Sequence, residues 1–86
     1  PPPRDFDLAI ATNVLLYFTP LERTLAFHWL RSRARPDAWF IHNDPRPEVE
    51  AEARSTGWTP GLVRRLALRG GLEDSFSLLQ PAAAPA

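Results

Sequence analysis

Residues 6–18, FDLAIATNVLLYF, decide the fold that the sequence predicts. The run 8–11, LAIA, is short and apolar throughout, which is typical of a strand buried on both faces of a parallel sheet. Thr12 and Asn13 interrupt the apolar run, and VLLYF then continues as a turn of helix. This stretch therefore predicts a buried strand with two polar residues at its carboxyl end.

A helix is predicted over residues 20–34. Thr19 suits the N-cap, Pro20 the first helical position and Glu22 the third, so Thr19 and Glu22 should form a capping box. Three large apolar residues, spaced four apart, make the face that we expect to pack on the core: Leu21, Leu25 and Trp29. Phe27 lies off that face.

A second short apolar run, AWFI at residues 38–41, predicts a second buried strand. The polar residues 42–44 follow it directly. A further helix is predicted over residues 48–55, because acidic side chains occupy its first turn and Arg54 lies near its end.

The last part of the chain predicts a β-hairpin, with strands over 62–69 and 74–80 joined by two glycines. Residues 1–5 are expected to be an extended lead-in, and 81–86 a disordered tail of Ala and Pro. Strands that alternate with helices indicate a parallel sheet with crossover connections. We therefore expect, over residues 6–80, an α/β fold with two parallel strands, crossover helices and a terminal hairpin.

Composition narrows the possible function classes. A chain of 86 residues allows one compact unit, and its net charge of zero argues against a nucleic-acid-binding module. No run is long enough to cross a membrane, and no leader marks the chain for secretion, so we expect a cytoplasmic protein. With no Cys and two His, a metal site is not expected. The absence of Met indicates a piece of a longer protein, and ten Arg with no Lys suggest a GC-rich, bacterial genome.

The phrase FDLAIATNVLLYF resembles the fourth strand and following segment of class I S-adenosylmethionine-dependent methyltransferases, and it is most similar to the chemotaxis receptor methyltransferase type. The next segments resemble the family's following helix and fifth strand, and RSTGW at 54–58 resembles the step before its terminal hairpin. The resemblance spans residues 6–80. It implies the carboxyl-terminal half of a Rossmann-like domain, inactive alone, whose first three strands, glycine-rich cofactor loop and ribose-binding carboxylate are missing from this chain.

The resemblance also implies site residues. The pair Thr12 and Asn13 would contact S-adenosylmethionine; the alternative is that Asn13 only caps the next helical turn. The substrate pocket would be shaped by residues at two strand ends: Tyr17, His42, Asn43 and Asp44. An apolar core role for Tyr17, and plain turn chemistry for residues 42–44, are the alternatives. Thr12 stands where the chemotaxis type usually has Arg, which argues against that type's receptor-glutamate substrate. The methyl acceptor is left open as an O, N or C atom.

Other polar groups are expected to be structural. His28 falls mid-helix and should lie on the surface or in helix packing. The basic cluster Arg64, Arg65 and Arg69 should form a solvated face. A second function remains open, in which the chain is a non-catalytic half-domain that associates through the uncovered edge of its first strand.

Overall fold

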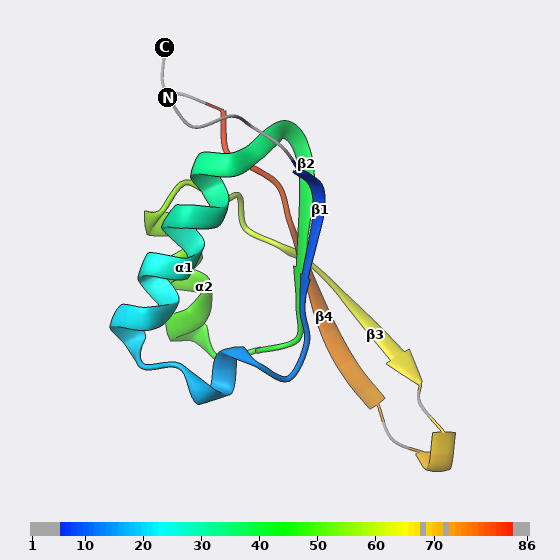
Figure 1. The fold of residues 1–86 in the computed structure, drawn as a ribbon. Helices are drawn as coiled ribbons and strands as arrows, with labels where there is room; N and C mark the ends of the chain where they lie inside the picture. The colour runs from blue at the N-terminus through cyan, green and yellow to red at the C-terminus, as the bar shows by residue number, and fades with distance from the viewer. Residues whose placement is uncertain (1–5, 68, 72, 84–86) are drawn as a thin grey trace.

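The computed structural model describes residues 6–67, 69–71 and 73–83, and it has an α/β architecture with a four-stranded open sheet and two helices (Figure 1). The elements in chain order are β1 (Phe6–Ala11), the 3-10 turn η1 (Leu15–Tyr17), α1 (Pro20–Arg33), β2 (Ala34–His42), α2 (Pro47–Ser55), β3 (Leu62–Ala67), the 3-10 turn η2 (Arg69–Gly71) and β4 (Glu73–Leu79). The expected lead-in, 1–5, lies outside the described residues.

The strand order in the sheet is β1-β2-β4-β3. β1 and β2 are parallel, with α1 between them in the chain, and their register runs from Leu8↔Trp39 to Ala11↔His42. β4 is antiparallel to both of its neighbours, β2 and β3. The expected pair of parallel strands and the terminal hairpin are therefore confirmed. The returning strand of the hairpin is inserted next to β2, so that β3 forms the edge.

The boundaries differ from the expected ones where the backbone changes direction. β2 begins at Ala34, four residues earlier than expected, because α1 passes straight into extended backbone (φ −74°, ψ 136° at Ala34). Proline at position 36 suits such extended geometry. β3 ends at Ala67 because η2 turns the chain back, with Gly70 and Gly71 at φ +80° and +78°. Glycine adopts these angles without steric cost.

The start of α1 has the expected capping box. The Glu22 backbone N–H donates to Thr19 Oγ1 at 3.2 Å, and the Thr19 backbone N–H donates to Glu22 Oε1 at 2.8 Å. These two bonds satisfy donors that a helix start otherwise leaves unpaired, and they fix where the helix begins.

The expected core face of α1 is wrong. Its three large apolar residues are mostly exposed, at 68%, 58% and 58%: Leu21, Leu25 and Trp29. Phe27 is instead fully buried, and Arg23 is 3% exposed. The buried face is stabilised by polar bonds, because Arg23 pairs with Glu52 of α2 at 2.6 Å and the Phe27 carbonyl accepts from Trp58 Nε1–H at 3.1 Å.

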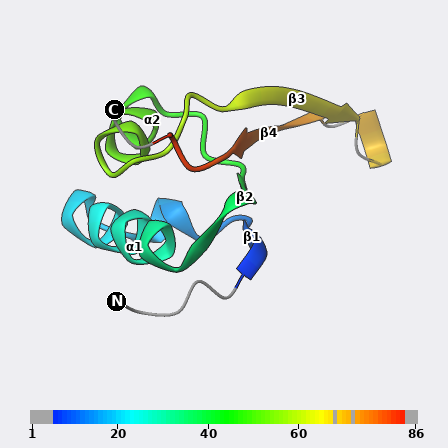
Figure 2. The ribbon, with the colours of Figure 1, turned by 90° about the horizontal axis from the view of Figure 1, so that it is seen from above.

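Both helices lie on one face of the sheet, and the core is enclosed between them and that face (Figures 1 and 2). The core is built around Phe27, Phe40 and Trp58. The opposite face is open, with Leu8 53% and Ile10 61% exposed on β1. The expectation that this strand is buried on both faces is therefore wrong, because in the described structure only one layer of helices covers the sheet.

The start of the segment expected to be a disordered tail contacts the segment around Trp58. Pro81 forms a bridge with Trp58, the Ala82 N–H donates to the Gly57 carbonyl at 2.8 Å, and Arg31 Nη2 donates to the Ala82 carbonyl at 3.0 Å. Residues 81–83 therefore make contacts with the body of the chain in the structure, while 84–86 lie outside the described residues. Neither of the helices in the described ranges has the length and apolar character needed to span a membrane.

Candidate functional site

A crevice of about 230 Å³ lies where β1 and β2 end. The carboxyl ends of parallel strands meet at the same edge of a sheet, which brings the residues after each strand together. The crevice is lined by the segments that follow the two strands: Asn13, Val14, Leu15, Leu16, Asn43, Asp44, Pro45 and Arg46. It thus contains three of the residues proposed from sequence, which are Asn13, Asn43 and Asp44.

Two asparagine side chains join the strand ends across this crevice. The Asn13 backbone N–H donates to Asn43 Oδ1 at 2.8 Å, and Asn43 Nδ2 donates to Asn13 Oδ1 at 2.9 Å. Asn13 has φ +60°, a left-handed conformation that Asn tolerates better than most residues. No side chain caps the following turn η1, whose N-cap is Val14, so Asn13 is not the cap that the alternative reading expected.

Asn43 also connects the crevice to the hairpin. Its Nδ2 donates to Asp74 Oδ2 on β4 at 3.1 Å, in addition to its bond with Asn13. One amide therefore bridges two segments that lie 30 and 31 residues away in the sequence. This placement shows that Asn43 has a structural role at the strand end in addition to lining the crevice.

Asp44 and Arg46 form a closed pair beside the asparagines. Arg46 Nη2 and Nε donate to the Asp44 carboxylate at 2.7 and 2.9 Å, and the Arg46 backbone N–H donates at 3.2 Å. These bonds hold the pKa of Asp44 below its ordinary range, although burial acts in the opposite direction. The carboxylate is therefore ionised and electrically balanced, which does not suit a general base at neutral pH.

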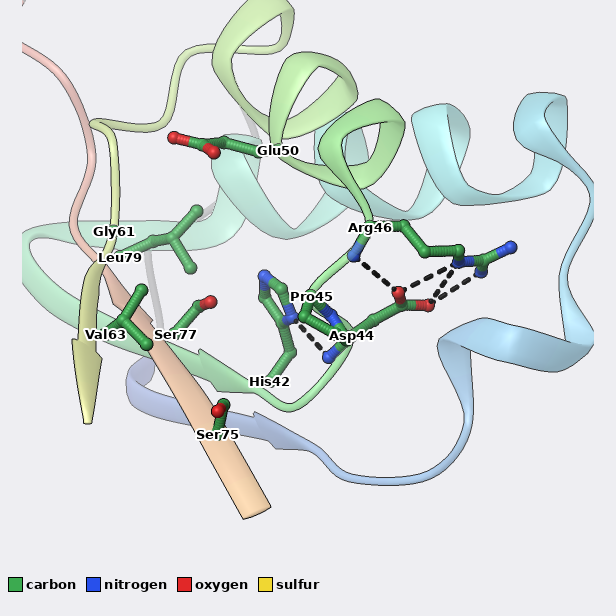
Figure 3. A pocket seen from close by; sticks show the side chains of 10 residues that line it. All are labelled: His42, Asp44, Pro45, Arg46, Glu50, Gly61, Val63, Ser75, Ser77 and Leu79. Carbon is green, nitrogen blue, oxygen red and sulfur yellow. Dashed lines mark hydrogen bonds and ion pairs between the residues drawn. The ribbon is translucent and has the colours of Figure 1, made fainter. Parts of the chain in front are cut away.

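His42 ends β2 but does not line the crevice. It is 2% exposed, and its ring centroid lies 6.2 Å from that of Phe27 and 5.8 Å from that of Phe40. Its Nδ1 accepts the Asp44 backbone N–H at 3.1 Å. Burial lowers the pKa of His42 below the ordinary 6.5, against the opposing effect of the Asp44 and Glu50 carboxylates. His42 lines a second, smaller pocket, which shares Asp44, Pro45 and Arg46 with the crevice (Figure 3).

Thr12 and Tyr17 are exposed and line neither pocket. Tyr17, 78% exposed, does not share a helical side with Asn13, because Asn13 leaves helical geometry and the turn begins only at Leu15. Leu15 is the buried side chain of this turn and lies against the crevice in place of Tyr17. His28 is exposed, as the surface interpretation predicts.

Sequence reasoning did not select Arg46 or Asp74. Arg46 lies between two prolines in the segment DPRP, and an Asp two residues before an Arg in such a rigid loop is a local signal for an ion pair. Asp74 carries no local signal, since its contact with Asn43 arises only because β4 returns beside β2.

The chemistry of the crevice is that of amides beside a neutralised ion pair. Such groups hold uncharged polar parts of a ligand by donating and accepting hydrogen bonds. Among the residues that the structure describes, no cluster of three or more His, Asp or Glu side chains is placed to bind a metal ion. No protein-family model matches the chain, and no curated protein is similar enough to count as a match.

Proposed function

We propose that this chain is the carboxyl-terminal half of a Rossmann-like, S-adenosylmethionine-dependent methyltransferase domain. The observation that carries the proposal is the polar crevice at the ends of β1 and β2, which lies at the TN step of FDLAIATNVLLYF. In open α/β sheets, ligands bind beyond the carboxyl ends of the strands. The parallel β1 and β2, with α1 between them, agree with the fourth strand, helix and fifth strand that the resemblance implies.

The crevice fits one wall of a cofactor site. Its volume of about 230 Å³ is below the roughly 300–1,000 Å³ that ligand pockets usually have. Asn13 Oδ1 accepts from Asn43 Nδ2, while Asn13 Nδ2 has no acceptor among the described residues and would be available to donate to a ligand. The glycine-rich loop and the ribose-binding carboxylate would come from preceding strands of a longer polypeptide.

The open face of the sheet supports the half-domain reading. Leu8 and Ile10 of β1 and Trp39 of β2 are exposed there, at 53%, 61% and 37%. The register places Leu8 opposite Trp39 and Ile10 opposite Ile41, so the apolar side chains are neighbours across the two strands. A complete domain buries such a face against another layer.

In the complete enzyme, the cofactor would supply an electrophilic methyl group on its sulfonium sulfur. The residues of this chain would bind and orient, because methyl transfer depends largely on holding the acceptor, the methyl carbon and the sulfur in line. Asn13, with Thr12 beside it, would position the cofactor, and Asn43 and Asp44 would border the acceptor side. His42 would hold the Asp44 backbone in place by accepting its N–H, and Tyr17 would lie at the outer surface. The acceptor is an O, N or C atom.

Calorimetric titration with S-adenosylmethionine tests the proposal. The 86-residue chain is expected to show no saturable binding below roughly millimolar concentration, because one wall places too few groups around the cofactor. A longer polypeptide that includes the upstream half is expected to bind. In that protein Asn13→Gly, which keeps the positive φ and removes the amide, should weaken binding, while Thr24→Ala on α1, which does not line the crevice, should not.

Two results would contradict the methyltransferase proposal. One is an upstream coding sequence that encodes no strand followed by a glycine-rich loop. The other is an Asn13→Gly affinity equal to that of the Thr24→Ala control. Micromolar binding by the chain alone would instead contradict the inactive half-domain and show a self-sufficient cofactor module.

The alternative function is that of a non-catalytic half-domain which associates through β1. β1 forms one edge of the described sheet, and it presents six residues, FDLAIA, of which Asp7 is the charged one. Exposed strand edges of this kind pair with other chains. Size-exclusion chromatography separates the two functions: a folded monomer at micromolar concentration rules out association, whereas a dimer that Ile10→Lys dissociates supports it.

A further inference from the structure

The second pocket lies between the start of α2 and the strands β2, β3 and β4, and it encloses about 110 Å³ (Figure 3). Val63 and Leu79 give it apolar walls, and its polar lining comes from His42, Ser75, Ser77 and Glu50 together with the Asp44–Arg46 ion pair. Asp44, Pro45 and Arg46 border both pockets, whereas Asn13 and Asn43 do not line this one, and binding here is measured without S-adenosylmethionine.

The hydrogen bond at Nδ1 fixes the protonation of His42. A backbone N–H can only donate, so Nδ1 accepts the Asp44 N–H through its lone pair and carries no proton. The neutral ring then carries its proton on Nε2. In Figure 3 the nitrogen that is not bonded to Asp44 faces the space between Leu79, Ser77 and Glu50. A side chain that is 2% exposed thus directs one N–H donor into the pocket.

The other polar groups of the pocket can accept hydrogen bonds. Ser75 and Ser77 alternate along β4 and therefore lie on the same face of the sheet. In the described part of the chain, neither hydroxyl has a protein partner. Glu50 adds a carboxylate, of which Oε1 accepts from Arg54 at 3.2 Å. Apart from the Asp44–Arg46 pair, whose charged groups bond to each other, the pocket therefore combines one fixed donor with several acceptors.

We propose that this pocket binds a small uncharged molecule that carries a primary carboxamide. The carbonyl oxygen accepts from His42 Nε2–H, and the amide N–H groups donate to Ser77 and Glu50. An anion is repelled by the Glu50 carboxylate, and a cation carries no acceptor for the Nε2–H donor. At about 30 Å³ for each water molecule, the pocket holds about four waters, or a ligand of four or five non-hydrogen atoms.

The test is an NMR titration of the labelled chain with acetamide, followed at the ring of His42 and the amide of Ser77. A saturable shift at both positions is expected, with a midpoint in the roughly millimolar range for so small a ligand. Acetate has the same shape with a negative charge, and it should bind at least tenfold more weakly. Shifts without saturation, or equal midpoints for acetamide and acetate, would overturn the proposal.

Two variants locate the binding. Ser77→Ala should weaken acetamide binding at least threefold, because it removes an acceptor and leaves the pocket shape. The matched control is Ser32→Ala, since the Ser32 hydroxyl donates to the Trp29 carbonyl within α1 and does not line the pocket. His42→Phe should abolish the saturable shift at Ser77. Equal affinities for Ser77→Ala and Ser32→Ala would refute the assignment even if His42→Phe does not fold.

Discussion

Replacing Phe27 by Ala tests which face of α1 holds the molecule together. Phe27 is fully buried, and its ring lies 5.6 Å from Phe40 in an edge-to-face contact and 6.2 Å from His42. Two residues further along the helix, Trp29 is 58% exposed. The spacing of apolar residues in the sequence assigns the core face to Leu25 and Trp29, whereas the structure assigns it to Phe27. The two assignments therefore predict opposite effects of substitution on stability.

The expected loss for Phe27→Ala is about 3–5 kcal/mol of unfolding free energy, from lost burial and the cavity left behind. A protein of this length has roughly 4–13 kcal/mol in total, at ~0.05–0.15 kcal/mol per residue. Phe27→Ala therefore uses up much of the stability. Phe27→Leu removes three carbon atoms and should cost about 2 kcal/mol, at ~0.8 kcal/mol per methylene, which keeps the variant measurable.

Urea unfolding followed by circular dichroism measures these values. Leu25→Ala and Trp29→Ala, on the exposed face of the same helix, are matched controls and should change the unfolding free energy by less than about 0.5 kcal/mol. If Trp29→Ala costs as much as Phe27→Leu in the isolated chain, the assignment of the buried face is refuted. The same control in a longer polypeptide reports whether another segment covers that face.

Three further predictions concern charge and backbone. Because burial lowers the pKa of His42 below 6.5, the unfolded chain takes up this proton first, so stability should fall as pH drops from 7 to 5. His42→Phe should reduce that loss of stability, measured as the urea midpoint against pH, while His28→Gln should leave the loss unchanged. Glu52→Gln should lower the urea midpoint far more than Glu50→Gln, because Glu52 faces a buried Arg whereas the Glu50 side chain is 54% exposed; equal effects would contradict this. Asn13→Ala should be less stable than Asn13→Gly by about 1 kcal/mol of unfolding free energy, because φ is +60° at this position and Ala adopts such an angle at a steric cost. A lower thermal midpoint for Asn13→Gly than for Asn13→Ala would contradict the left-handed geometry.

Local patterns in the sequence were enough to predict most elements of the fold. The TPLE segment predicts the start of α1 to the residue, since capping is a short-range interaction. The position of β4 between β2 and β3 could not be predicted, because pairing between strands depends on contacts that are distant in the sequence. The prediction of which face of α1 is buried was wrong for the same reason, since that face also depends on contacts with distant parts of the chain. Arg23 becomes a core residue only because Glu52, 29 residues later, meets it.

The candidate site was predictable as a location more than as a set of contacts. Strand ends of a parallel sheet meet, so Asn13 and Asn43 could be expected on one edge. The burial of His42 was not predicted, because the run AWFI was expected to be buried on both faces. In the structure the side chains of β2 alternate, and Ala38, Phe40 and His42 are buried on one face. The 3-10 geometry of η1 that turns Tyr17 outward is likewise not readable from an apolar run.

The short stretch of pairing between β4 and β2, which connects the hairpin to the rest of the sheet, has a consequence for deuterium exchange. β4 pairs with β2 at three positions, Phe40↔Leu79, Ile41↔Leu78 and His42↔Ser77, while its pairing with β3 continues to Ala67↔Glu73 (Figure 1). A lone two-stranded ribbon is marginally stable, so its outer amides exchange through local opening without unfolding of the helices. Asp74 lies in that outer part, and its bond to Asn43 breaks in the same event. The exchange rate of the hairpin thus also measures how often the crevice loses this link.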